Sequence, residues 1–498
     1  MDTIARTRTG PVEGRVKEDV LFFAGIPYAA PPIGALRFEA PRAHEGWRQT
    51  LSATRIGNAA LQNAGAGLTS SPPRRMHEDC LSLNVTTPAL DDAGRPVLVW
   101  IHGGGFRTGQ GGIPWYNGTS FAKRGDIVSV SINYRLGALG FANLAGLGAP
   151  VSGLAGILDQ IAALEWVRDN IAAFGGDPAK VTVAGESAGA MSVGVLLGCP
   201  AAAGLFRGAI AQSGAAHHTL DDPTGRAIAD VLCQQLGAHD LESLRALPTE
   251  RFLEGQERVD EVLAGQSRIG TTDISGADGM WFQPSVDGSV LPQPPVDAVR
   301  SGASSDVALL IGTNAHETTL WHQKEPDEAR LEKVVAGYLP DATSALDAYR
   351  RDHPGASAFD LLIAVTSDYT FRIPALRLAE AHAANGGSTW NYLFSWRSRA
   401  FGGHLGATHA LEIPFAFNNL ERAGVQTFLG EGPLPQALAS DMHAAWIAFV
   451  RDADPNTNEC PAWPCFDEKR RASMDFGDEI TVRENLLPES RLQWEGVR

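Results

Sequence analysis

Long apolar runs alternate with amphipathic stretches through the first half of the chain. Residues 96–102, 127–133 and 208–212 form continuous apolar runs, which are typical of strands covered on both faces of a sheet. Residues 156–173 carry apolar side chains at three- and four-residue spacing, which predicts an amphipathic helix. This alternation predicts an α/β fold with a large, mostly parallel central sheet flanked by helices.

The beginning and the second half of the chain depart from this alternation. Short alternating segments broken by glycine at residues 3–25 predict a small N-terminal antiparallel meander. Residues 220–290 and 326–387 look mainly helical, and we expect them to be insertions over the carboxyl edge of the sheet, where a pocket would lie. Residues 390–396 predict the last major strand, and residues 434–450 predict a late amphipathic helix.

Composition limits the partners and the location of the chain. It has 498 residues and a net charge of −16, which argues against nucleic acid or an anionic membrane as a partner. There is no run of eighteen apolar residues, so no membrane span is predicted. The N-terminus lacks the apolar core of a signal peptide, so we expect a cytoplasmic protein unless a leader precedes it. No linker-like segment divides the chain, which predicts a single domain over residues 1–498.

The cysteines predict neither disulfides nor a metal site. Five cysteines are an odd and sparse set, which fits a reducing compartment and free thiols. Cys460 and Cys465 are neighbours, but no histidine or second cysteine pair completes a zinc site around them. We therefore expect no metal and no organic cofactor.

One pentapeptide carries the strongest chemical signal in the sequence. The β-branched run 181–183 predicts a strand, Gly-Glu-Ser-Ala-Gly follows at 185–189, and residues 190–197 can form an apolar helix. Strand, Gly-x-Ser-x-Gly and helix is the context of a nucleophile elbow, which would present the Ser187 hydroxyl above the sheet. The amide of Ala188, at the helix N-terminus, would point to where negative charge develops.

A second glycine-rich loop follows the strand at 96–102. His102 is followed by Gly103, Gly104, Gly105 and Phe106. Consecutive glycines after a strand let backbone amides point into a cavity, as in the oxyanion loop of lipases and esterases. A phosphate-binding loop is a poorer interpretation, because no Gly-Lys-Ser/Thr follows.

The nucleophile needs a base and an acid that orients it. In this fold class the acid and then the histidine follow the serine in the chain, on loops after late strands. Glu317 and His409 satisfy this order, but position alone leaves His404 as an alternative base. Ser213, at the end of the 208–212 strand, is a further residue expected to support the site.

The motifs together resemble the type-B carboxylesterases, a family of α/β-hydrolases that includes bacterial para-nitrobenzyl esterase-like enzymes and the cholinesterases. The match covers nearly the whole chain and rests on these segments: 10–14, 23–28, 78–81, 102–106, 133–135, 158–160, 185–189, 312–314, Glu317, 371–372, 406–409 and 454–456. The resemblance implies Ser187 as nucleophile, His409 as general base and Glu317 as acid. It implies an oxyanion hole from the amides of Gly104, Gly105 and Ala188, and places Glu186 near the histidine.

The resemblance also implies two buried ion pairs, Arg37 with Glu78 and Arg135 with Asp159.

The sequence departs from the family at two places. Leu61 stands where disulfide-linked members have the cysteine that pairs with the one at Cys80, so that pairing is missing. The loop 62–77 contains no tryptophan or tyrosine, whereas cholinesterases stack an aromatic ring there on the quaternary ammonium. Choline esters are therefore expected to be poor substrates.

The predicted function is hydrolysis of small to medium, uncharged carboxylic esters through an acyl-enzyme intermediate with a Ser-His-Glu triad. The chain is expected to act on small molecules as a monomer or small homo-oligomer. Two alternatives are a binding or adhesion-type relative of the same fold, which the intact triad weighs against, and a thioesterase or amidase side activity. An apolar substrate pocket is predicted from Phe106, Trp115, Trp281, Phe282, Phe371, Phe401 and Phe415.

Overall fold

A computed structural model describes residues 2–63, 73, 75–322 and 324–497, and its residues group into two compact units. The first unit comprises Met1–Ile113, Asn117–Arg207 and Ala216–Ala298; the second comprises Pro114–Tyr116, Gly208–Ala215 and Val299–Arg498. Each unit is therefore assembled from separate stretches of chain, and the single domain expected from the sequence stays a prediction.

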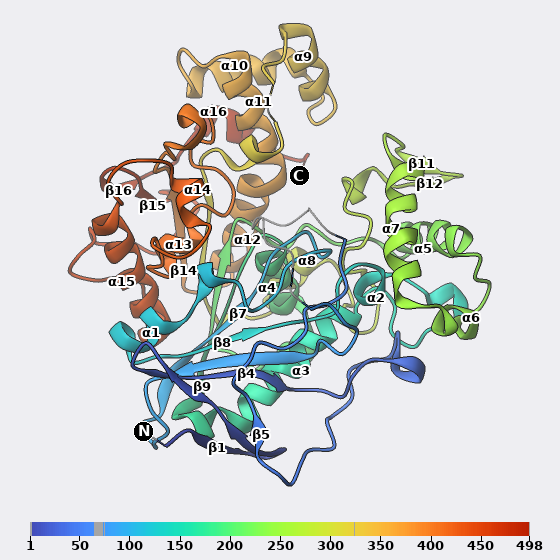
Figure 1. The fold of residues 1–498 in the computed structure, drawn as a ribbon. Helices are drawn as coiled ribbons and strands as arrows, with labels where there is room; N and C mark the ends of the chain where they lie inside the picture. Colours follow the sequence, from blue (N-terminus) through green and yellow to red (C-terminus); the bar gives the residue numbers. More distant parts are fainter. Residues whose placement is uncertain (1, 64–72, 74, 323, 498) are drawn as a thin grey trace. The chain divides into compact units, whose positions relative to one another are not determined.

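The first unit contains the parallel strands that carry the nucleophile motif (Figure 1). Its main strands lie in the order β9 (Gly176–Glu186), β7 (Arg95–Ile101), β8 (Val128–Ile132), β6 (Ser82–Thr87), β4 (Val20–Pro27) and β3 (Arg15–Lys17). Strand β7 pairs in parallel with β8 and β9, whereas β6, β4 and β3 join antiparallel. Every residue of β7 except Pro96 is buried, as its continuous apolar run predicts.

The N-terminal meander is distributed over two sheets. Strands β1 (Ile4–Thr7) and β2 (Gly10–Glu13) pair antiparallel as predicted, and β5 (Leu51–Ser52) joins β2 in parallel. Strands β3 and β4 instead continue the main sheet, because β4 is buried along most of its length and pairs with β6. The small N-terminal sheet therefore contains β1 and β2 from the segment 3–25, but not β3 and β4.

Helices of the first unit include the predicted amphipathic helix and the first predicted insertion. They are α1 (Thr119–Gly125), α2 (Gly137–Phe141), α3 (Ala155–Asn170), α4 (Ala188–Gly198), α5 (Asp222–Leu236), α6 (Leu241–Ala246) and α7 (Thr249–Leu263), followed by the hairpin β11 (Arg268–Ile269) and β12 (Thr272–Asp273). The apolar positions predicted for α3 are all buried. Helices α5–α7 confirm the helical nature of the 220–290 segment, and α8 (Pro295–Arg300) follows it.

The second unit has its own run of parallel strands. β10 (Gly208–Gln212), β13 (Ala308–Asn314), β14 (Thr389–Phe394) and β15 (Ser473–Phe476) pair in parallel in this order, and β16 (Ile480–Arg483) adds antiparallel. Two short strands therefore follow β14, whereas the sequence analysis expected the segment 390–396 to be the last major strand. β15 is short and contains the charged Asp475, whose carboxylate is paired with Arg483 on β16, so its pattern is not that of an apolar strand.

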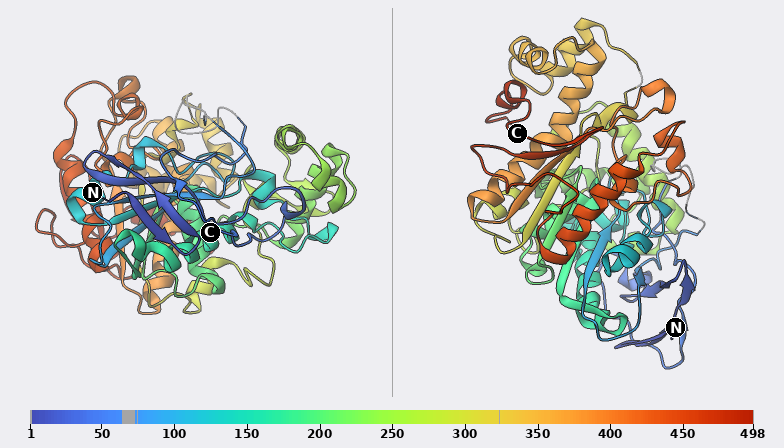
Figure 2. Two further views of the ribbon diagram at one scale, coloured as in Figure 1. Left: turned by 60° about the horizontal axis from the view of Figure 1, so that its bottom comes forward. Right: turned by 90° about the vertical axis from the view of Figure 1, so that its left-hand side faces the viewer.

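Helices cover both faces of this second set of strands (Figure 2). The unit's helices are α9 (Glu328–Ala336), α10 (Ala342–Asp352), α11 (Ala358–Ser367), α12 (Ile373–Ala384), α13 (Ile413–Ala416), α14 (Val425–Leu429), α15 (Gln436–Asp452) and α16 (Pro488–Leu492). On β14, the rings of Trp390 and Tyr392 pack against α15 at 6.0 and 5.3 Å between ring centroids. The pleat turns Asn391 and Leu393 to the opposite face, and α12 packs against β13 and β14.

Both ion pairs that the resemblance implied are present and buried in the first unit. Arg135 donates to Asp159 from Nε at 2.8 Å and from Nη2 at 2.7 Å, and neither side chain is more than 4% exposed. Arg37 donates to Glu78 from Nε at 2.7 Å and from Nη2 at 2.5 Å. Both predictions are confirmed, and each bidentate pair ties together segments distant in sequence.

Replacing Arg135 by methionine should destabilise the protein by about 3–5 kcal/mol, because the Asp159 carboxylate would be left buried without its partner. The control is Arg168→Met, which removes an exposed ion pair with Asp169 and should cost less than about 1 kcal/mol. Urea unfolding measures both. The double variant Arg135→Met/Asp159→Leu should regain much of the loss; equal costs for Arg135→Met and Arg168→Met would contradict the account.

All five cysteines are free thiols, as predicted. Cys80 is buried, and burial raises its pKa above the ordinary value for a thiol. Among the residues that the structure describes, no helix is both long enough and apolar enough to cross a lipid bilayer.

Candidate active site

Ser187 occupies a strained turn between β9 and α4 in the first unit. Its backbone has φ 57° and ψ −126°, a conformation that costs a non-glycine residue on the order of 1–3 kcal/mol. The strand ends at Glu186 and the helix begins at Ala188, so the turn consists of the serine alone. The sequence-predicted elbow is therefore present, and Ala188 contributes one of the N-terminal amides that lack an acceptor within the helix.

The two glycines of the motif allow this turn to close. A Cβ atom on Gly185 would collide with the backbone of Gly189, and one on Gly189 would collide with the backbone oxygen of Ile101 at the end of β7. Helix α4 thus packs directly on the strands that precede it. An alanine at either position would force the elbow open, which explains why both positions need glycine.

The glycine loop after β7 lies against the nucleophile within the same unit. A Cβ atom on Gly103 would come within 2.6 Å of the Glu186 carbonyl oxygen and 2.9 Å of Ser187 Cβ. Gly104 and Gly105 have φ of 117° and 60°, and a Cβ on Gly105 would meet no atom within 4 Å. Their amides have no hydrogen-bond acceptor among the described residues. The loop therefore presents free donors beside Ser187.

Buried neighbours fix the start of this loop. The Tyr134 hydroxyl donates to the His102 carbonyl oxygen at 2.8 Å, and the two rings stack with their centroids 4.6 Å apart. Burial lowers the pKa of His102 to about 4, so its imidazole is neutral at physiological pH. The Gly104 carbonyl oxygen accepts the amides of Arg107 and Thr108 at 3.0 Å, which turns this carbonyl away from the glycine amides.

The second unit contains a buried carboxylate–imidazole pair. His409 Nδ1 lies 2.7 Å from Glu317 Oε2, and the two side chains are 2% and 0% exposed. The other carboxylate oxygen, Oε1, accepts the backbone amide of Asn314 at 2.7 Å. The pair is also joined through the backbone, since the His409 amide donates to the Glu317 carbonyl oxygen at 3.2 Å. This geometry fixes the ring and leaves Nε2 as the nitrogen that can exchange a proton.

The competing histidine is in a different environment. His404 is exposed, and its ring stacks on Phe359 with centroids 4.9 Å apart. The structure therefore brings His409, and not His404, to Glu317.

A buried polar network that the sequence analysis missed surrounds Glu317. Asn314 Nδ2 donates to Glu412 Oε2 at 2.6 Å and to the Thr408 carbonyl oxygen at 2.7 Å. Gln212 Nε2 donates to Glu412 Oε1 at 3.1 Å. Burial, and next the nearby Glu317 carboxylate, raise the pKa of Glu412 to about 7. Glu412 lies three residues after His409, a signal that becomes informative only once the histidine is chosen.

The raised pKa makes folding stability depend on pH. Glu412 binds a proton more tightly in the folded chain, so its contribution is present below pH 4.5 and is lost as pH rises through about 7. Between pH 4.5 and about 7, the free energy of unfolding of the wild type should fall by on the order of 3 kcal/mol relative to that of Glu412→Gln, whose amide does not titrate. Urea unfolding from pH 4.5 to 8 tests this through the slope of the unfolding free energy against pH, because the introduced amide can shift the whole curve by a constant amount. The exposed Glu421→Gln is the control and should follow the wild type; a Glu412→Gln curve parallel to that of the wild type would refute the assignment.

Two aromatic rings pack on the His409 imidazole in the second unit. Phe371 lies 4.7 Å from the His409 ring and Trp321 lies 5.2 Å from it, centroid to centroid, and these two aromatic rings stack on each other. Trp321 is 55% exposed and was not among the predicted pocket residues. Phe371 lies in a π-helical turn, Asp368–Arg372, between α11 and α12, a feature that often marks functional sites.

The other predicted pocket residues have varied surroundings. Phe106 packs on Phe141, Trp115 on Phe428, and Phe415 on Phe394 and Trp396, whereas Trp281 and Phe282 are buried and Phe401 is 71% exposed. Their role in a substrate pocket stays a prediction. The loop 62–77, on which the choline argument depends, lies partly outside the described residues, at 64–72 and 74.

The two residues predicted to support the site are both buried. Glu186 is 1% exposed at the end of β9, and Ser213 is fully buried with its amide donating to the Gly312 carbonyl oxygen at 2.9 Å. Within the described parts of the chain, no group of three His, Cys, Asp or Glu side chains is arranged to hold a metal ion.

Comparison with known proteins identifies the family. The sequence pattern described as "Carboxylesterase family" matches residues 1–494. The chain belongs to the carboxylesterase family. It is 38% identical to phenmedipham hydrolase of Pseudarthrobacter oxydans, over 96% of this chain and 95% of that protein. It is 37% identical to para-nitrobenzyl esterase of Bacillus subtilis (strain 168), over 98% of this chain and 97% of that protein.

Solved structures support the same assignment. A carboxylesterase of Geobacillus stearothermophilus matches with a TM-score of 0.87 and 36% identity, covering 99% of this chain and 100% of that one. A structure of para-nitrobenzyl esterase matches with a TM-score of 0.88 and 34% identity, covering 99% of both chains. This carboxylesterase therefore has the α/β-hydrolase fold and is a carboxylic ester hydrolase, which acts on small-molecule esters.

Proposed function

We propose that this carboxylesterase is a serine hydrolase that cleaves small to medium, uncharged carboxylic esters through an acyl-enzyme intermediate. Ser187 is the nucleophile, His409 the general base and Glu317 the acid that orients it. The observation that carries the proposal is the buried 2.7 Å contact between His409 Nδ1 and Glu317, together with the strained elbow at Ser187.

In the first half-reaction, His409 Nε2 takes the proton of the Ser187 hydroxyl as Oγ attacks the ester carbonyl carbon. The carbonyl oxygen becomes an oxyanion, which accepts hydrogen bonds from the amides of Gly104, Gly105 and Ala188. The imidazolium then gives its proton to the alkoxide as the carbon–oxygen bond breaks, and the alcohol leaves. The Glu317 carboxylate stabilises the imidazolium without taking its proton.

In the second half-reaction, water attacks the acyl-enzyme. His409 accepts a proton from the water, the oxyanion forms again in the same amide hole, and collapse returns the proton to Ser187 Oγ. The acid leaves as a carboxylate. Each amide acts in the transition state, where the charge develops, so the free donors of Gly104 and Gly105 contribute to rate and not only to binding.

The proposed substrate class rests on the aromatic rings beside the base. Trp321 and Phe371 form a stacked apolar surface against His409, and Trp321 has an exposed face that a substrate can contact. Such a surface favours aryl and alkyl groups without charge. The relatives named phenmedipham hydrolase, para-nitrobenzyl esterase and pyrethroid hydrolase also suggest that this family accepts varied small molecules.

Choline esters should be hydrolysed less well than neutral esters of the same size. The loop 62–77 contains no tryptophan or tyrosine to stack on a quaternary ammonium, so the cation would lose hydration without compensation. The measurement is kcat/KM for butyrylcholine against its uncharged 3,3-dimethylbutyl analogue. A clear preference for the cation would defeat this part of the proposal. A protein that hydrolyses neither of these two esters nor any nitrophenyl ester would instead favour the binding-protein alternative.

A further inference from the structure

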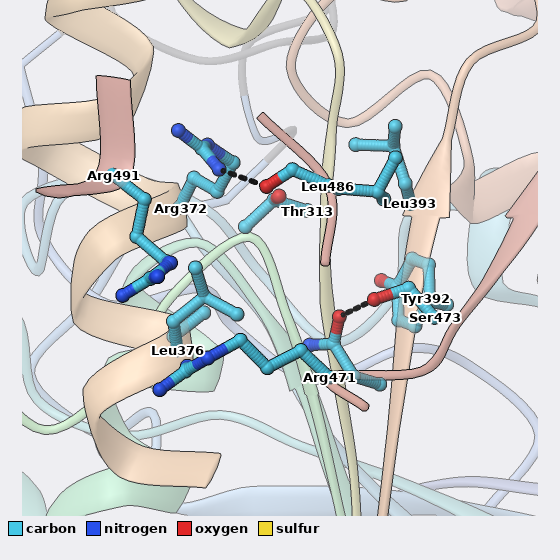
Figure 3. A pocket seen from close by; sticks show the side chains of 11 residues that line it. Thr313, Arg372, Leu376, Tyr392, Leu393, Arg471, Ser473, Leu486 and Arg491 are labelled. Atoms are coloured by element: carbon cyan, nitrogen blue, oxygen red, sulfur yellow. Dashed lines mark hydrogen bonds between the residues drawn. The ribbon is translucent and has the colours of Figure 1, made fainter. Parts of the chain in front are cut away.

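A pocket in the second unit lies outside the catalytic groups. It lies between α12, the strands β13 to β15 and the segment that leads into α16 (Figure 3). Three arginines line it: Arg372, Arg471 and Arg491. Leu376, Leu393 and Leu486 supply apolar walls. A pocket lined by three cationic groups is unexpected in a chain with a net charge of −16.

Two of the three arginines have close carboxylate partners. Arg372 donates to Asp368 from Nε at 2.5 Å and from Nη2 at 2.6 Å. Arg471 pairs with Glu380, which also accepts from Arg377. These pairs hold the two guanidinium groups in place, and they leave the carboxylates with most of their acceptor capacity used.

Arg491 is the exception. The residue is 8% exposed, yet its ion pair with Glu495 is long, at 3.3 Å, and the Glu495 side chain is 57% exposed. Its Nε is buried and has no hydrogen-bond acceptor among the described residues. Burial, and next the neighbouring Arg471, lower the pKa of Arg491. Figure 3 shows the guanidinium groups of Arg491 and Arg471 beside Leu376. A buried donor without a partner is costly, so an acceptor placed beside Arg491 Nε would stabilise the site.

We propose that this pocket binds a small oxyanion, a carboxylate or a phosphate, through the guanidinium groups of Arg491 and Arg471. Oxygens of such an anion fit the fork of donors that an arginine presents, and Arg491 Nε–H would gain its missing acceptor. The anion also offsets the repulsion between Arg491 and Arg471. The leucine side chains of the lining offer apolar contact to a short alkyl tail, which a carboxylate carries and phosphate lacks.

Isothermal titration of the whole protein with sodium butyrate and with inorganic phosphate, at constant ionic strength in chloride, tests the proposal. One saturable site per chain is expected, and Arg491→Gln should weaken it about tenfold or more through loss of a charged donor. The matched control is Arg470→Gln, an exposed arginine paired with Glu484 at 3.3 Å, which should bind like the wild type. If only one of the two anions binds, the result shows whether the site takes a carboxylate or a phosphate.

A second variant keeps the test decisive if Arg491→Gln does not fold. Ala375→Leu adds bulk to the pocket lining without removing a charge, and it should also weaken binding. Arg491→Lys keeps the charge but loses the Nε donor, and should bind more weakly than the wild type. The absence of saturable binding of either anion to the wild type would overturn the proposal, as would equal affinity in the wild type and the folded pocket variants.

Discussion

Ester hydrolysis by Ser187→Ala should fall by on the order of 10⁴- to 10⁶-fold in kcat, with the fold retained. Without Oγ there is no nucleophile, and the residual rate over water comes only from the amide donors and substrate positioning. Alanine at φ 57° is strained to the same degree as serine, so stability should change little.

The measurement is kcat for a nitrophenyl ester, with near-ultraviolet circular dichroism and the unfolding temperature as checks of the fold. Ser192→Ala is a useful control, because Ser192 lies on α4 and its hydroxyl donates to the Ala188 carbonyl oxygen within the helix. It should keep activity near that of the wild type. Substantial turnover by purified Ser187→Ala would remove Ser187 from the mechanism.

His409→Ala should be nearly as inactive as Ser187→Ala, because the serine proton then has no acceptor. His404→Ala is the matched control: the same substitution on the same loop, at a ring that is exposed and stacks on Phe359. It should keep activity close to that of the wild type.

The wild-type rate should also fall at acidic pH, because an imidazolium cannot accept the serine proton. A pH–rate profile with a nitrophenyl ester measures this acid limb. An inactive His404→Ala together with an active His409→Ala would reassign the base.

The sequence predicted the elbow because its requirements are local. The strand, the two glycines and the apolar helix lie within adjacent residues, and the structure has β9, the positive φ of Ser187 and α4 where the motif requires them. The apolar strands β7 and β8 were predicted for the same reason: strands buried on both faces have continuous apolar runs.

Features that depend on tertiary contacts could not be read in this way. Strands β15 and β16 are short, and Asp475 interrupts the apolar pattern of β15. Its charge is tolerated there because Arg483 on the neighbouring strand forms an ion pair with it. Glu412 is recognised as part of the site by its contact with Asn314, and Trp321 by its contact with His409. No spacing rule predicts either contact. His404 and His409 were equivalent by position, and only the resemblance, and then the Glu317 contact, separated them.

The most direct test of the central claim is to trap the covalent intermediate on Ser187. The protein is mixed with excess nitrophenyl acetate, quenched in acid within the burst phase, digested, and sequenced by tandem mass spectrometry. The account predicts one acetyl group per active chain, on Ser187 of the 185–189 motif, and none in Ser187→Ala. An acetyl group on any other residue, or turnover with no covalent adduct, would contradict it.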